Sequence, residues 1–150
     1  MIMISDLQVV WQQSAETYAV FRELLEGTTT EKLYVRPTED IWSISDIAQH
    51  IARANIVYAM VMEGHEPFRR EPTDRPSLVE LLEYINYSET FVQEVFERST
   101  TESLQLVRAD DWNPLGPDVS GPLNSFWFAL QIVRHTAYHV GQISYSLQLP

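Results

Sequence analysis

The chain has 150 residues, 45% of them hydrophobic and 21% charged, which is typical of one globular domain spanning residues 1–150. Its formal net charge of −11 at pH 7, without a Lys/Arg cluster, argues against binding to nucleic acid or to an anionic membrane surface, because both are negatively charged. The absence of cysteine excludes disulfides, thiolate metal ligands and a cysteine nucleophile. Since no apolar run approaches membrane-spanning length and the N-terminus lacks a secretory pattern, we expect a cytoplasmic protein.

Capping boxes, in which a serine and the residue three positions later bond each other's backbone N–H groups, predict three helix starts. They are Ser5-x-x-Gln8, Ser43-x-x-Asp46 and Ser77-x-x-Glu80. Apolar residues follow each box at three- and four-residue spacing, which predicts amphipathic helices that end near Gly27, near Met62 and before Ser99. A short capped turn is expected at residues 28–33.

Residues 99–122 form a long connection that is rich in Pro, Gly, Asp and Ser toward its end and has no convincing strand pattern. A short helical turn is expected at residues 101–106. Asp110, Asp111 and Trp112 are interpreted as a solvated loop with one anchoring aromatic ring, or as the border of a site mouth.

A last helix is expected to begin near Pro122 or Leu123 and to run almost to Pro150. Together with the three helices before it, this helix predicts an all-α protein, a four-helix bundle of the antiparallel type. The long connection before it leaves room for a non-sequential helix order.

The last helix carries His135 and His139 one turn apart on an inward, largely apolar face. This spacing lets one helix supply two ligands to one metal ion. His50, on the apolar face of the second predicted helix, is the best candidate for a third ligand. A divalent cation would satisfy three imidazoles that are costly to bury alone. The alternative is that they are core histidines satisfied by hydrogen bonds.

Four other residues bear on this site. Asp46 either only caps its helix or also acts as an outer partner or general base for the first histidine. Gln142 either orients an imidazole or is a buried amide bonded to another helix. Gly141 costs about 1 kcal/mol relative to Ala inside a helix, and the close approach of another helix would explain it. His65 lies in a polar loop and is expected at the surface.

The last helix is also apolar on the side opposite its histidines. Either a neighbouring helix of the same bundle covers this side, or a second copy of the chain does so in a homodimer. The residues are Leu130, Val133, Ala137, Val140 and Leu147.

Two histidine-containing segments stand out, WSISDIAQHIA at residues 42–52 and HTAYHVGQI at residues 135–143. The first resembles the second-helix pattern, and the second the last-helix His-x-x-x-His-x-Gly-Gln pattern, of the DinB-like (YfiT-like) superfamily of metal-dependent hydrolases. LYVRP at residues 33–37 is also similar to the family, and the resemblance covers essentially the whole chain. The chain departs from the pattern at Tyr138, where many members have His, and at Val140, where many have Arg.

The resemblance implies a four-helix bundle, often a homodimer, in which His50, His135 and His139 bind one divalent ion, commonly zinc or nickel. Characterised relatives include S-transferases and isomerases that use a low-molecular-weight thiol such as bacillithiol, mycothiol or glutathione. Any anion-recognition role of an Arg at position 140 is absent here.

The expected function is therefore that of a metal-dependent hydrolase or thiol-dependent S-transferase with a small-molecule substrate. Three neutral imidazoles and an open fourth position would let a cation activate water or a thiol. The lack of cysteine fits a thiol supplied from outside the chain. The alternative is a non-catalytic helical bundle that binds a ligand or partner and in which the metal is structural or absent.

Overall fold

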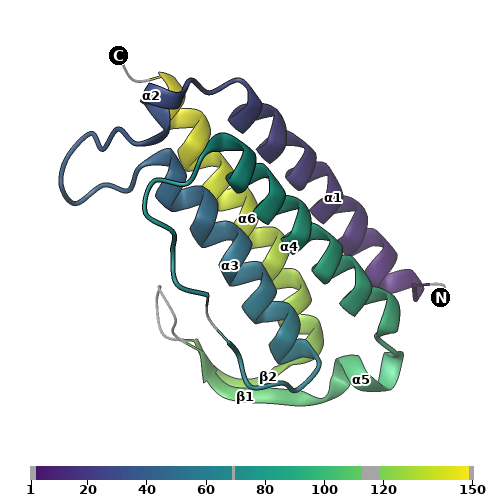
Figure 1. Ribbon diagram of the computed structural model, residues 1–150. Coiled ribbons are helices and arrows are strands. Elements are labelled where there is room, and N and C mark those ends of the chain that lie inside the picture. Colours follow the sequence, from purple (N-terminus) through teal and green to yellow (C-terminus); the bar gives the residue numbers. More distant parts are fainter. Residues whose placement is uncertain (1–2, 69, 113–118, 149–150) are drawn as a thin grey trace.

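The computed structural model describes residues 3–68, 70–112 and 119–148. Four long helices form a bundle, and two short helices and a two-stranded antiparallel hairpin lie at its ends (Figure 1). The long helices are α1 (Ser5–Glu26), α3 (Ile44–Met62), α4 (Leu78–Arg98) and α6 (Ser125–Gln148). The shorter elements are α2 (Thr30–Leu33), α5 (Thr101–Gln105), β1 (Val107–Trp112) and β2 (Val119–Asn124). The predicted all-α, four-helix fold is confirmed, with the small hairpin added to it.

The helix order around the bundle is not the order along the chain. α3 packs against α4 and α6, and α1 packs against the same two helices, so α1 and α3 lie at opposite corners. The ring of Trp11 contacts that of Phe96, so α1 and α4 are antiparallel. Arg98, however, binds Glu63 just beyond the end of α3, so α3 and α4 run in the same direction. The expectation of an antiparallel bundle is therefore wrong for this pair, because the described residues between α3 and α4, 63–68 and 70–77, return along the bundle before α4 begins (Figure 1).

The predicted helix caps at Ser43 and Ser77 are confirmed, and the one at Ser5 is wrong. Ser43 and Ser77 each accept a hydrogen bond from the backbone N–H three residues later, and the acidic residue there bonds back. Ser5 is instead the first residue of α1, and Ile4 at the N-cap position has no side-chain cap. The Gln8 side chain donates to the carbonyl of Met3 at 2.9 Å. Because Ser5 already lies in the first turn, Ile4 occupies the N-cap position, and its apolar side chain cannot accept a hydrogen bond.

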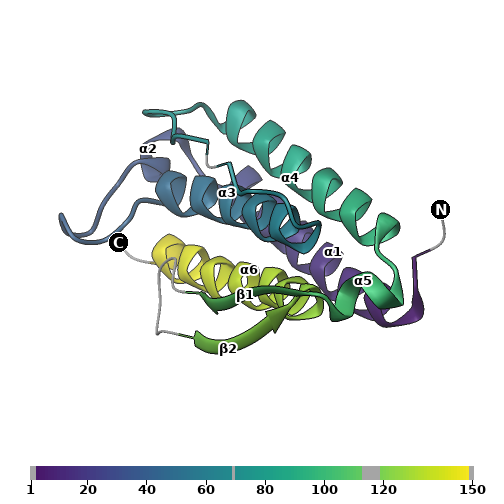
Figure 2. The same cartoon turned by 90° about the horizontal axis from the view of Figure 1, so that it is seen from below.

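The hairpin lies near the end of α3 and the start of α6 and was not predicted (Figure 2). Its pairing is irregular, with register shifts on both sides of Ala109, which explains why the sequence shows no alternation. Asp110 and Asp111 are exposed in β1, whereas the ring of Trp112 packs on Phe128 with centroids 4.9 Å apart. The short helix α5 is confirmed, and α6 begins at Ser125, later than expected because residues 119–124 form β2.

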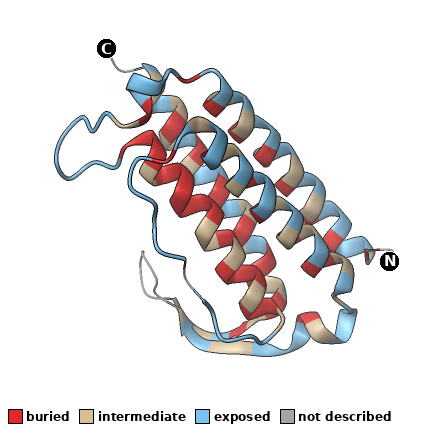
Figure 3. Ribbon diagram, in the orientation of Figure 1, coloured by how far each residue is buried: buried red, intermediate tan, exposed pale blue. Residues whose placement is uncertain are grey.

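Buried residues lie along all four long helices (Figure 3). The interior consists of two apolar clusters separated by a layer of buried polar side chains. The cluster nearer the hairpin includes Leu7, Met62, Phe96 and Phe128. The other cluster, nearer α2, includes Phe21, Ile47, Ile85 and Ile143. Between them, each long helix contributes one hydrogen-bonded member to what we call the polar layer: Tyr18, Asn55, Ser88 and Thr136. All four are fully buried.

The second apolar side of α6 is only partly covered. Val140 is buried and Leu147 packs against the core, so a helix of the same bundle covers this part. Leu130 remains 47% exposed, and Ala137 is exposed as well. Gly141 does not mark a close helix contact, because a Cβ added there would meet no described atom within 4 Å. Among the described residues, no helix combines the length and apolar character needed to span a bilayer.

Ser43 caps its helix and Ser5 does not, so replacing each serine tests this assignment. Ser43→Ala should lower the free energy of unfolding by about 1 kcal/mol, because it leaves a helix N–H without its acceptor. Ser5→Ala should change it by less than about 0.5 kcal/mol, because this hydroxyl caps nothing. Urea unfolding of both variants measures the two effects, and equal losses would contradict the assignment.

Candidate metal centre

Helices α3 and α6 bring the three predicted histidines together. His50 comes from α3, and His135 and His139 come from successive turns of α6. One ring nitrogen from each lies within 4.8 Å of those of the other two. The Nε2 atoms of His50 and His135 are 2.8 Å apart, and the three ring centroids are 4.4–4.7 Å apart. The imidazoles therefore point at one common region.

Burial keeps the rings of His135 and His139 neutral at physiological pH, because it lowers the pKa of both. The loss of solvent around His135 lowers its pKa from the ordinary 6.5 to about 3, and the nearby His139 and His50 add to this effect. Desolvation also lowers the pKa of His139, although its hydrogen bond to the side-chain oxygen of Gln142 acts in the opposite direction. Neutral imidazoles keep a free lone pair, which is the form that binds a metal.

Gln142 fixes the orientation and the tautomer of His139. The Nδ1–H of His139 donates to Oε1 of Gln142 at 2.6 Å, and because an amide oxygen can only accept, the proton must be on Nδ1. The lone pair of His139 is then on Nε2. The amide nitrogen of Gln142 donates in turn to the hydroxyl of Tyr138 at 3.2 Å. The sequence left two alternatives for Gln142, orienting an imidazole or bonding to another helix, and this hydrogen bond corresponds to the first.

The donor set fits a divalent cation. At 2.8 Å, one of the Nε2 atoms of His50 and His135 carries a proton and donates it to the lone pair of the other. A cation held by both Nε2 atoms would require the donating ring to carry that proton on Nδ1 instead, which leaves both Nε2 lone pairs for the ion. Nδ1 of His135 is buried and has no partner among the described residues. Three converging imidazoles without cysteine suit zinc or nickel.

Aromatic rings surround the three histidines. Trp42 contacts His50 edge-on at 4.9 Å and stacks on His139 at 6.4 Å between centroids. Tyr58 contacts His135 at 5.6 Å. Neither ring was predicted from the sequence to belong to the site. Tyr58 lies on the same face of α3 as His50, two turns later, and could have been found from that spacing. Trp42 precedes the helix, and no periodicity places it.

Asp46 and His65, which were also considered for the site, contact residues other than the three histidines. The carboxylate of Asp46 accepts from the backbone N–H and hydroxyl of Ser43 at 2.9 and 2.7 Å, and it pairs with Arg36 at 2.8 Å. These contacts account for it as a helix cap. His65 is exposed near Glu63, as expected for a surface residue.

Comparisons with known proteins agree with the fold. A family model described as the DinB superfamily matches residues 13–143. The chain is similar to a conserved protein from Enterococcus faecalis, with a TM-score of 0.73, 16% identity, and coverage of 97% of this chain and 96% of that one. It is also similar to a DinB-like protein from Bacillus subtilis, with a TM-score of 0.71, 16% identity, and coverage of 93% and 90%. At this identity the two structures show a shared fold. No curated protein matches the sequence.

The lowered pKa of His135 predicts how the stability of the metal-free protein depends on pH. Below about pH 6.5, His135 is protonated in the unfolded chain but stays neutral in the folded chain. The free energy of unfolding therefore falls as the pH falls toward 3. The slope from one such group is at most about 1.4 kcal/mol per pH unit. His135→Gln should flatten the profile between about pH 5 and 6.5. Urea unfolding across this range in the presence of a chelator measures it, and an unchanged slope in His135→Gln would contradict the shift.

Proposed function

The chain belongs to the DinB superfamily, and we propose that it is a divalent-metal-dependent enzyme, a hydrolase or thiol-dependent S-transferase. His50, His135 and His139 would hold one ion, with zinc or nickel the preferred metals. The observation that carries the proposal is the convergence of three imidazole nitrogens within 4.8 Å from two separate helices. A cytoplasmic location and a small-molecule substrate are parts of the same proposal.

The surroundings of the three rings support a catalytic site more than a structural one. Structural zinc sites usually have four protein ligands, whereas catalytic sites have three and keep one position open. In the described part of the chain, no fourth His, Cys, Asp or Glu joins this group. An ion bound by three neutral imidazoles also keeps its full positive charge, which strengthens its effect on a fourth ligand.

The residues of the chain would bind the ion, orient its ligands and exclude water from the site. The ion would act as the Lewis acid. A divalent cation at this position lowers the pKa of a water molecule or thiol and so makes it a better nucleophile. Gln142 accepts the Nδ1 proton of His139, which leaves the Nε2 lone pair of this ring for the ion. Trp42 and Tyr58 flank the histidines and keep bulk water from their sides.

A thiol from outside the chain is the favoured nucleophile in the transferase form of this proposal. The protein has no cysteine of its own, so any thiol chemistry needs a separate low-molecular-weight thiol. The rings next to the site are aromatic, and Val140 occupies the position where many family members have Arg. Recognition of the thiol would then differ from that in relatives with this Arg.

A non-catalytic bundle that binds a ligand or partner is the second candidate. It is favoured by one observation: the carboxylate of Asp46 bonds Ser43 and Arg36, so it is committed elsewhere and does not act as a general base beside the histidines. Turnover assays of the metal-loaded protein with several thiols and electrophiles separate the two candidates. Inertness toward every class, with the metal retained, would favour the second.

Metal uptake tests the ligand assignment directly. The wild type should bind close to one equivalent of Zn²⁺ or Ni²⁺. His50→Ala and His139→Ala should each abolish stoichiometric binding, because two imidazoles hold an ion far more weakly than three. His65→Ala is the control and should bind as the wild type does, since its ring is exposed and outside the group. Metal analysis after dialysis measures this, and full retention in the first two variants would refute the site.

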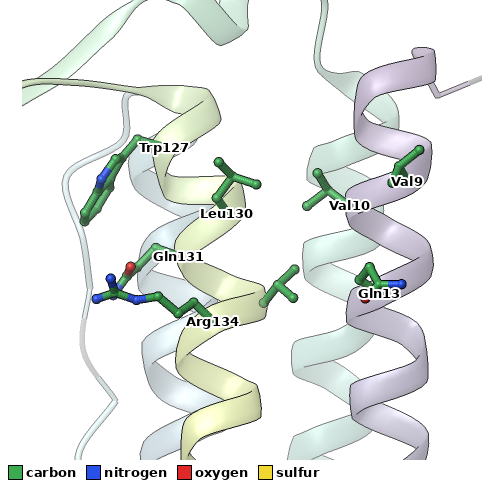
Figure 4. Close-up of a pocket in the computed structure, with 8 residues that line it drawn as sticks. Val9, Val10, Gln13, Trp127, Leu130, Gln131 and Arg134 are labelled. Carbon is green, nitrogen blue, oxygen red and sulfur yellow. The ribbon is translucent and has the colours of Figure 1, made fainter.

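We also propose a homodimer through the exposed apolar face between α1 and α6. A groove of about 530 Å³ lies there, with α6 side chains on one side and α1 side chains on the other (Figure 4). It is lined by Val9, Val10, Gln13, Trp127, Leu130, Gln131, Val133 and Arg134. Val9 is 65% and Leu130 47% exposed, and both belong to this groove, whereas exposed apolar side chains on a monomer are usually scattered singly.

A charge placed on this face should break the dimer. Leu130→Glu would bury a carboxylate in an apolar interface and should yield a monomer at micromolar concentration. Val79→Glu is the matched control, since Val79 is 63% exposed on α4, away from the groove. Light scattering coupled to size-exclusion chromatography gives the mass, and a monomeric wild type would rule out the dimer.

A further inference from the structure

We propose that Asn55 and Thr136 are positioning residues that hold α3 against α6 and so set the spacing of the imidazoles in the metal centre. The inference rests on the proposed metal function. Its evidence is separate, because it comes from hydrogen bonds in the polar layer and not from the histidines.

The polar layer has a defined direction for every hydrogen bond. Thr136 donates its hydroxyl proton to the carbonyl of Ile132 at 2.7 Å, so its oxygen accepts from the amide of Asn55 at 2.8 Å. Ser88 donates to the carbonyl of Ala52 at 3.0 Å, so its oxygen accepts from the hydroxyl of Tyr18 at 2.9 Å. No hydroxyl in the layer is free to turn.

Asn55 is the centre of this network. Its amide nitrogen has two protons, and it donates one to Tyr18 at 2.9 Å and the other to Thr136 at 2.8 Å. Burial raises the pKa of Tyr18 to about 12, so its hydroxyl stays protonated and continues to donate to Ser88. The amide plane of Asn55 is therefore fixed from two sides, by α1 and by α6.

The bond between Asn55 and Thr136 is a second link between the two helices that carry the histidines. Thr136 directly follows His135, and Asn55 follows His50 by five residues, which is about 7.5 Å along α3. The first link is the 2.8 Å contact of the two imidazoles themselves. Two links at different heights prevent α3 from both sliding and rotating against α6.

A polar pair at this place has a cost that apolar residues would avoid. The layer separates two well-packed apolar clusters, and a side chain of similar size without polar atoms would let them join. Apolar contacts are non-directional and tolerate small slides, whereas a short hydrogen bond between buried groups accepts only one register. A metal site needs such precision, since ligands placed loosely lose affinity.

The polar layer also contains its own control residue. Ser88 is as deeply buried as Thr136 and belongs to the same network, but it lies on α4, which carries no histidine. If the layer only stabilises the bundle, Ser88 and Thr136 should be equivalent. If the Asn55–Thr136 bond positions the imidazoles, only Thr136 should affect the metal centre.

The experiment compares Thr136→Val, Thr136→Ser and Ser88→Ala by their binding of Co²⁺, which reports ligand geometry through its visible absorption. We expect Thr136→Val to weaken Co²⁺ binding about tenfold, as is typical when an outer support of a ligand is removed, and to shift the absorption bands. Thr136→Ser keeps the hydroxyl and should restore both. Ser88→Ala should lower the Tm as much as Thr136→Val does, yet keep the affinity within about twofold and leave the bands unchanged.

A metal-free measurement keeps this inference separate from the proposed function. In the apo protein, the nuclear Overhauser effect between ring protons of His50 and His135 should weaken in Thr136→Val and persist in Ser88→Ala. If the wild type binds no Co²⁺, the metal function fails, and this signal still decides the positioning role. If Thr136→Val does not fold, Asn55→Ser takes its place in the comparison. Wild-type affinity, bands and ring contacts in these variants, or equal losses in Ser88→Ala, would overturn the proposal.

Discussion

The packing of α3 against α6 is the contact on which the candidate site depends. His50 and His135 are 85 positions apart in the chain, and neither helix alone can gather three imidazoles. Burial removes solvent from His135 and His139 and disfavours their charged forms. The same packing therefore brings the three rings together and keeps these two in the neutral form that can bind a metal.

The unusual connections of the bundle make this packing possible. Because the described residues between α3 and α4 return along the bundle, α4 runs beside α3 in the same direction and places Ser88 opposite Ala52. The long connection after α4 then carries the chain through α5 and the hairpin to the other side, where α6 begins beside the end of α3. The hydroxyl of Ser125 donates to the carbonyl of Met62 at 2.9 Å and joins these two ends. The hairpin also supplies Trp112, which packs beside Tyr58.

The proposed chemistry follows from the type of ligand more than from the fold. Relatives at 16% identity share the architecture, so the architecture alone does not specify a reaction. The site in this chain combines the Tyr138–Gln142–His139 series of hydrogen bonds with the ring of Trp42 beside two imidazoles, and the chain has no cysteine. These features favour an ion held by histidine with a nucleophile taken from solution.

The sequence by itself determined the features that arise within one or two helical turns. These are the four long helices, the caps at Ser43 and Ser77, and the inward direction of the three histidines, because apolar spacing and capping are local properties. The tertiary structure alone decided the features that need a distant partner. The irregular strands are held by pairing with each other, α3 and α4 run parallel because of a returning segment, and the amide of Asn55 binds two helices that no spacing rule relates. Local patterns record which face of a helix is buried, but not which helix lies against it.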